Sequence, residues 1–163
     1  MAAELALALG CDAVEGDDYH SPASQEKMRG GVALDDSDRE TWLDRLGAAL
    51  ATRPGGVVGT CSALKRRYRE RLRAQVPGLK WVFVEISQAD AESRVGRRTS
   101  HLFPPSLVAS QFAALESPMG EDGVLVVPAS GQLREQRDAV LQWLAAAPGA
   151  VSGQVSHIRM ESP

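Results

Sequence analysis

The stretch VVGTCSALKRRYRERLRAQVPGLKWVFVEI (57–86) holds two apolar runs on either side of a charged segment. Residues 57–61 and 81–86 predict buried strands, because near-continuous apolar runs are typical of strands covered on both faces. Residues 63–75 predict a charged helix, and Pro77 and Gly78 end it. A strand–helix–strand unit of this kind predicts a parallel sheet covered by helices.

The same alternation continues in both directions along the chain. Strands are predicted at 12–15 and 124–127, and helices at 2–9, 23–29, 37–52, 89–96, 105–115 and 132–147. The pattern predicts one α/β domain over residues 1–147, with a small, polar tail (148–163) that we expect to be disordered. A doubly wound domain normally opens with a strand, whereas a helix comes first here.

Composition narrows the function classes. Of 163 residues, 44% are hydrophobic and 24% charged, and the net charge is −3. An acidic chain argues against bulk binding to nucleic acid or to anionic membranes. No signal peptide and no apolar run of about 18 residues is visible, and Cys11 and Cys61 lack metal-ligand spacing. We expect a cytoplasmic protein with free thiols and with neither nucleic-acid nor membrane partners.

An acidic turn follows the strand predicted at 12–15. Glu15, Asp17, Asp18 and His20 lie within it, at the edge where open α/β sheets bind ligands. Such a group could hold Mg²⁺ through water or deprotonate a hydroxyl. A solvated turn explains the same residues, since aspartate and glycine favour turns.

Cations make up the other candidate groups. Arg39, in the first turn of a helix, opposes the helix dipole, so a carboxylate ligand or a salt bridge to a neighbouring aspartate has to explain it. Lys65 and Arg69 lie four residues apart, which predicts one helix face. The loop from Arg94 to His101 contains several arginines and is typical of either a lid over phosphates or a charged surface loop.

Several motifs together resemble a known family: EGDDYHSP (15–22), KM (27–28), LDDSDRETWL (34–43), CSALKRRYRE (61–70), and HLFPP with SQFAALESP within 101–118. In order and spacing they are similar to the gluconokinases, small P-loop kinases related to shikimate and adenylate kinases. The resemblance covers residues 2–147. It implies a parallel-sheet α/β fold of the nucleoside-monophosphate-kinase type, with a substrate-binding region at about 17–53 and a lid at about 94–104.

The resemblance also implies an activity: ATP, with Mg²⁺, phosphorylates the 6-hydroxyl of D-gluconate. It implies roles for individual residues as well. These are Asp17 and Lys65 as catalytic residues, Glu15 near the metal through water, His20, Arg39, Arg69 and Gln111 as sugar-acid ligands, and Arg94, Arg98 and His101 as lid residues facing the nucleotide. A homodimer is compatible with the family.

The chain departs from the family at its front. No GxxxxGK[ST] occurs in the sequence, whereas the family has a strand and such a loop before a helix like 2–9. That loop cradles the ATP phosphates. We therefore expect an N-terminally truncated fold without its first strand and Walker A loop, inactive as written. Alternatives are a kinase of another carboxylate-bearing acceptor, such as shikimate, and a non-catalytic protein that binds a sugar acid.

Overall fold

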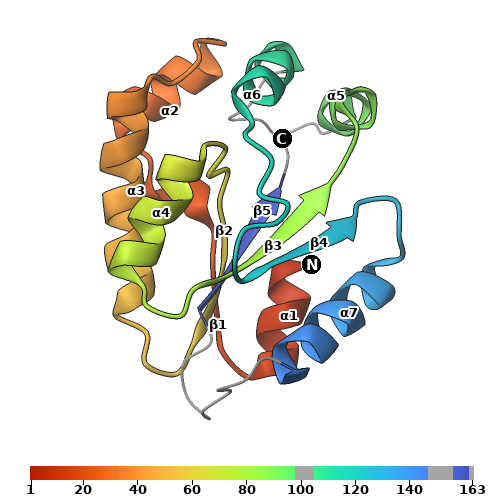
Figure 1. The fold of residues 1–163 in the computed structure, drawn as a ribbon. Coiled ribbons are helices and arrows are strands. Elements are labelled where there is room, and N and C mark those ends of the chain that lie inside the picture. The colour runs from red at the N-terminus through yellow and green to blue at the C-terminus, as the bar shows by residue number, and fades with distance from the viewer. Residues whose placement is uncertain (98–104, 147–155, 162–163) are drawn as a thin grey trace.

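The computed structural model describes residues 1–97, 105–146 and 156–161. Helices and strands alternate along the chain, as predicted (Figure 1). In chain order the elements are α1 (Ala2–Leu9), β1 (Asp12–Val14), the 3₁₀ turn η1 (Gly16–Tyr19), α2 (Pro22–Arg29), α3 (Asp36–Ala51), β2 (Val57–Thr60), α4 (Arg66–Gln75), β3 (Lys80–Glu85), α5 (Gln88–Gly96), the 3₁₀ turn η2 (Pro105–Leu107), α6 (Val108–Ala114), β4 (Val124–Pro128), α7 (Leu133–Ala146) and β5 (Ser156–Glu161).

The strands form one sheet in the order β1-β2-β5-β3-β4, and every neighbouring pair is parallel. Strand β5 lies in the centre, where it pairs with β2 on one side and with β3 on the other. The predicted parallel sheet is therefore confirmed. Because the strands are parallel, all their carboxyl ends point to the same edge of the sheet.

The expectation of a disordered tail is wrong for residues 156–161, which form β5. Strands β2 and β3 would otherwise each present a row of unpaired backbone groups to the space between them. One extended segment supplies hydrogen-bond partners to both rows, which is a strong reason for a weakly apolar segment to become a strand. The rest of the tail, 148–155 and 162–163, lies outside the described residues.

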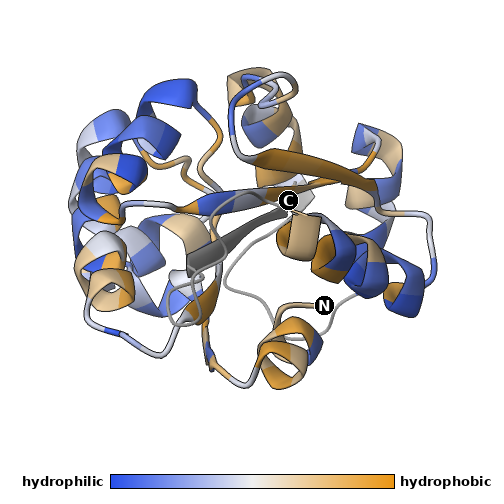
Figure 2. Cartoon of the chain, turned by 60° about the horizontal axis from the view of Figure 1, so that its bottom comes forward, coloured by the Kyte–Doolittle hydropathy of each residue, from blue (hydrophilic) through white to orange (hydrophobic). Residues whose placement is uncertain are grey.

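Helices cover both faces of the sheet. On one face, α3 and α4 contribute Trp42, Leu46 and Leu72 to a buried cluster that includes Trp81 and Phe83 of β3. On the other face, α1 and α7 pack on the alternate β3 residues, Val82 and Val84. In Figure 2 the hydrophilic colouring is strong on the peripheral helices, whereas α1, beside the N-terminus, is largely coloured hydrophobic. No helix in the described ranges is long and apolar enough to cross a membrane.

Local capping sets where α3 begins. The Asp35 carboxylate accepts from the Asp38 amide at 2.9 Å, and the Asp38 carboxylate accepts from the Asp35 amide at 3.2 Å. This reciprocal pair satisfies amides that a helix start leaves free. It fixes Arg39 in the first turn of α3.

Candidate active site

The carboxyl ends of β1 and β2 lie side by side, since Val14 pairs with Gly59. The turn η1 follows β1 directly, and Cys61 follows β2. Ligands of open α/β sheets bind outside this edge. The acidic turn predicted from the sequence therefore stands where this fold class places its ligand.

Gly16 fastens the acidic turn to its surroundings. Its amide donates to Thr60 Oγ1 at 3.1 Å, and its carbonyl oxygen accepts from Trp42 Nε1 at 2.7 Å. A Cβ at position 16 would lie 2.1 Å from the Thr60 carbonyl oxygen, so only glycine fits. Thr60 Oγ1 also donates to the Glu15 carboxylate. These contacts hold Glu15 and Asp17 against the end of β2.

Asp17 is the carboxylate with the electrostatics of a base. Desolvation by the surrounding protein raises its pKa, although 55% of the side chain is exposed, and the negative charges of Glu15 and Asp18 raise the pKa further. A carboxylate with a raised pKa accepts a proton more readily than an ordinary aspartate. Its position and its pKa therefore suit the removal of a proton from a hydroxyl.

His20 lies beside Asp17, with its Nε2 3.8 Å from Asp17 Oδ1. Its ring stacks on the Trp42 indole at a centroid distance of 4.4 Å and an interplanar angle of 13°. Burial lowers the pKa of His20 to about 4, and the positive charge of Arg39 adds to that shift. His20 is therefore a neutral imidazole near pH 7, able to donate one hydrogen bond and accept another.

Arg39 is a buried cation, with 8% of its surface exposed. Burial lowers the pKa of its guanidinium. Within the described residues its side chain has neither an ion pair nor a hydrogen bond. The neighbouring acids are engaged elsewhere: Asp38 pairs with Lys27 at 2.6 Å and Asp36 with Lys65 at 2.9 Å. The salt bridge that would have explained Arg39 without a ligand is not formed.

Two further polar atoms near the carboxyl edge are buried without partners. They are His20 Nδ1 and Gln111 Oε1, in the part of the chain that the structure describes. Gln111 is on α6, which lies at the carboxyl edge of the sheet (Figure 1). An unsatisfied buried polar group costs about 1–3 kcal/mol, and an unpaired buried charge costs more. His20 and Arg39 lie close enough for the Arg39 charge to act on the His20 ring, so a ligand with a carboxylate and a hydroxyl would satisfy both.

Lys65 and Arg69 do not share a role. Lys65 precedes α4, and its ammonium binds Asp36 Oδ1 at 2.9 Å. Asp36 also accepts from the Arg67 guanidinium and the Tyr68 hydroxyl. The hydrogen bonds from Arg67, Tyr68 and Lys65 lower the pKa of Asp36. This network joins the start of α3, with Arg39, to the segment that carries Lys65.

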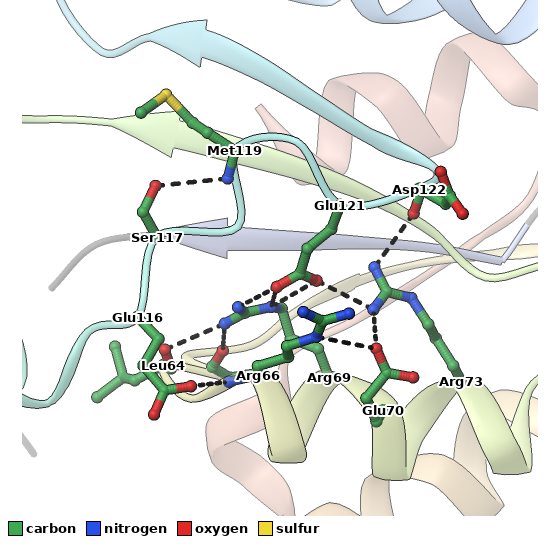
Figure 3. Close-up of polar contacts among 11 residues, drawn as sticks. Leu64, Arg66, Arg69, Glu70, Arg73, Glu116, Ser117, Met119, Glu121 and Asp122 are labelled. Carbon is green, nitrogen blue, oxygen red and sulfur yellow. Dashed lines mark hydrogen bonds and ion pairs between the residues drawn. The ribbon is translucent and has the colours of Figure 1, made fainter.

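Arg69 turns inward from α4 and is fully buried. Its guanidinium donates to the Glu121 carboxylate and to the carbonyl oxygens of Ala63 and Leu64 (Figure 3). The expectation that Lys65 and Arg69 lie on one helix face is wrong, because Lys65 stands before the first helical residue. The four-residue spacing had assumed a helix from residue 63.

Of the predicted lid residues, Arg94 is in α5 and donates to the carbonyl oxygen of Ala129, after β4, at 2.8 Å. That contact places Arg94 near the carboxyl end of β4. Arg98 and His101 lie outside the described residues.

Glu15 and Asp17 are the carboxylates that could face a metal. No cluster of three or more histidine, cysteine or acidic side chains suited to a metal occurs within the described ranges. Mg²⁺ usually keeps several waters and takes one or two protein carboxylates together with phosphate oxygens. The two carboxylates at this edge therefore fit Mg²⁺ shared with a phosphate and do not form a closed cage.

Sequence reasoning missed several residues that shape the site. Thr60 could have been found, since it lies near the carboxyl end of the strand predicted at 57–61, at the ligand edge. Trp42 lies in the helix predicted at 37–52 and had no site role, although its ring stacks on His20 and its Nε1 donates to the Gly16 carbonyl oxygen. Glu121, in a loop far along the chain, had no sequence signal that linked it to Arg69.

Comparisons with known proteins place this geometry in context. No family model matches the chain. A gluconokinase from Gluconobacter oxydans is 40% identical over 148 residues, which cover 88% of this chain and 80% of that protein. The thermoresistant gluconokinase of Escherichia coli is 37% identical over 131 residues, or 78% of this chain and 75% of that protein.

Solved structures agree. The crystal structure of a gluconokinase from Sinorhizobium meliloti matches with a TM-score of 0.79 at 40% identity, over 88% of this chain and 84% of that one. A sugar kinase from Janibacter matches with a TM-score of 0.79 at 31% identity, over 90% and 87% of the two chains.

Proposed function

This chain belongs to the gluconokinase family, and on that premise we propose that its site binds D-gluconate and serves the ATP-dependent phosphorylation of the 6-hydroxyl. The observation that carries the proposal is the buried Arg39, unpaired within the described residues, beside the unpartnered His20 Nδ1. A sugar acid supplies a carboxylate for the cation and hydroxyls for the imidazole. The relatives are gluconokinases, so a shikimate-like acceptor is not favoured.

Acceptor binding follows from the donors and acceptors at the edge. The Arg39 guanidinium binds a carboxylate through two parallel N–H donors. Neutral His20, through Nδ1, and Gln111, through Oε1, each have an unused hydrogen-bonding position for a sugar hydroxyl. This set would fix gluconate with its carboxylate at the start of α3 and its hydroxyl chain along the edge.

Transfer then needs a proton acceptor and neutralised charge. The 6-hydroxyl oxygen forms a bond to the γ-phosphorus of ATP, the bond from that phosphorus to the β–γ bridging oxygen breaks, and ADP leaves. Asp17, with its raised pKa, accepts the hydroxyl proton. Lys65 adds positive charge beside the acceptor. Positioning and charge account for most phosphoryl-transfer catalysis.

The nucleotide side of the site rests on fewer residues. Arg94 at the carboxyl end of β4 would contact ATP phosphates, and Glu15 would hold Mg²⁺ through water. When bound, Mg²⁺ neutralises charge on the transferring phosphate.

A reducing cytoplasm suits the free thiols of Cys11 and Cys61, and a homodimer remains part of the proposal by family likeness.

A coupled ADP-release assay tests this function. The chain is joined to an N-terminal strand–GxxxxGKS segment, because such a loop supplies the backbone amides that bind ATP phosphates. We expect gluconate-dependent ADP release that Asp17→Asn lowers by at least about 10²-fold, the usual contribution of a general base. Gluconate-independent ATP consumption, or equal rates with shikimate, would overturn the proposal.

A further inference from the structure

The Arg69 guanidinium forms most of its possible hydrogen bonds with other residues of the protein. Its Nε donates to both carboxylate oxygens of Glu121, at 3.1 and 3.0 Å, and one terminal nitrogen donates to the same carboxylate. The other terminal nitrogen donates to the carbonyl oxygens of Ala63 and Leu64, at 3.0 and 3.1 Å. The side chain is 0% exposed. Little of the guanidinium is left for a ligand.

Glu121 is held from a second side. Arg73, one turn further along α4, donates to its Oε2 at 3.0 Å and to the Asp122 carbonyl oxygen at 3.2 Å (Figure 3). Burial opposes ionisation of Glu121, but the hydrogen bonds from Arg69 and Arg73 outweigh it and lower the pKa. Glu121 is therefore a partly buried, ionised partner whose position both arginines set.

The same two chain segments are tied again beside this ion pair. The Glu116 amide donates to the Leu64 carbonyl oxygen at 2.9 Å, and the Arg66 amide donates to the Glu116 carboxylate at 2.6 Å. Leu64 therefore accepts from both Arg69 and Glu116. Residues 63–66 and 116–121 form one hydrogen-bonded unit, which we call the clamp.

Each side of the clamp leads directly to a residue of the proposed acceptor site. Residues 63 and 64 immediately precede Lys65, whose ammonium reaches Asp36. Residue 116 comes shortly after α6, the helix of Gln111. A shift of the clamp would therefore move Lys65 and Gln111 together, although they lie far apart in sequence.

We propose that Arg69 and Glu121 are positioning residues, which set the places of Lys65 and Gln111 for the acceptor without contacting it. This inference rests on the proposed function and replaces the sugar-acid ligand role that the family resemblance implied for Arg69. A hollow of about 290 Å³ borders Arg69, lined also by Arg66, Glu116 and Met119. A ligand there would have to displace Glu121 to reach the Arg69 donors.

Two variants separate positioning from direct binding. Arg69→Lys keeps the charge but loses the planar fork that joins a carboxylate to two carbonyls. Glu121→Gln keeps the shape but removes the carboxylate. Arg71→Lys is the matched control, since Arg71 lies on the same helix in a more exposed pair with Asp44, at 2.7 Å. Gluconate affinity is measured by calorimetry on each protein, with folding checked by circular dichroism.

The clamp predicts that Arg69→Lys and Glu121→Gln each weaken gluconate binding at least about fivefold. The double variant should bind gluconate with an affinity within about twofold of the more impaired single variant. Residues of one network show such non-additivity. Arg71→Lys stays within about twofold of the parent. A direct ligand role predicts that Glu121→Gln leaves affinity unchanged or tightens it, because Arg69 is then released. That result, or additive losses, would overturn the proposal.

A second measurement does not depend on gluconate. Hydrogen exchange of the Arg66 and Glu116 amides reports the clamp itself, since both amides donate within it. We expect at least about tenfold faster exchange in Glu121→Gln, or in Glu121→Asp if the first variant does not fold. Unchanged exchange overturns the clamp. If the parent protein releases no heat on titration with gluconate while the amide exchange rates change as expected, the proposed function fails and the clamp stands.

Discussion

Alanine at position 16 would place its Cβ 2.1 Å from the Thr60 carbonyl oxygen and 3.2 Å from the Thr60 carbonyl carbon. These are backbone atoms at the end of β2, which cannot move aside as a flexible side chain would. The turn η1 must therefore shift away from β2. The shift stretches the hydrogen bonds from the Gly16 amide to Thr60 and from Trp42 Nε1 to the Gly16 carbonyl.

The cost follows from these contacts. Overpacking of a buried site costs about 1–3 kcal/mol, and each weakened hydrogen bond adds up to about 1 kcal/mol. Against that, alanine reduces the entropy of the unfolded chain by about 0.4–1 kcal/mol. We expect Gly16→Ala to lower the free energy of unfolding by about 3 kcal/mol.

Urea unfolding followed by circular dichroism measures this change. With an m-value of about 2 kcal/mol/M, the midpoint falls by about 1.5 M. Gly55→Ala is the control, because a Cβ there meets no atom within 4 Å; its midpoint should stay the same or rise slightly. Equal midpoints for the two variants would refute the tight approach of η1 to β2.

Two other predictions concern the cation and the imidazole. Arg39→Met removes a buried charge that has no ion pair in the described residues. The free energy of unfolding should therefore stay the same or rise by about 1 kcal/mol, while calorimetry should show at least about tenfold weaker gluconate binding. A clearly destabilised variant contradicts this prediction. The pKa of His20 falls from 6.5 to about 4 on folding, so the unfolded chain takes up the proton first and stability is lost as the pH drops from 6.5 towards 4. That loss of stability is about 3 kcal/mol, and His20→Gln should abolish it because glutamine does not titrate. Asp17, whose raised pKa acts in the opposite direction, contributes equally in both proteins. Parallel pH profiles of urea midpoints would show that His20 is not buried as a neutral ring.

The local pattern of apolar residues was sufficient to predict most strands of the sheet. The runs at 57–61 and 81–86 became β2 and β3, because uninterrupted apolar side chains need cover on both faces. Residues 156–161 were not recognised as a strand. Their strand state depends on two neighbours distant in sequence, and strand formation is decided by such context more than by composition.

The acidic turn was placed correctly at the carboxyl edge, because parallel topology alone dictates that position. Side-chain partners were harder to predict. Whether Arg39 pairs with an adjacent aspartate depends on Lys27 and Lys65 engaging those acids first. The inward turn of Arg69 depends on Glu121, whose loop no helical spacing connects to α4.

Calorimetric titration with D-gluconate and with D-glucitol tests the central claim most directly. The two ligands share a chain of hydroxyls, and only gluconate has a carboxylate for Arg39. A charge-assisted hydrogen bond contributes about 1.5–3 kcal/mol, so we predict that gluconate binds at least about tenfold more tightly than D-glucitol and that Arg39→Met removes the difference. Equal affinities for the two ligands in the parent protein would contradict a carboxylate-binding site built around Arg39.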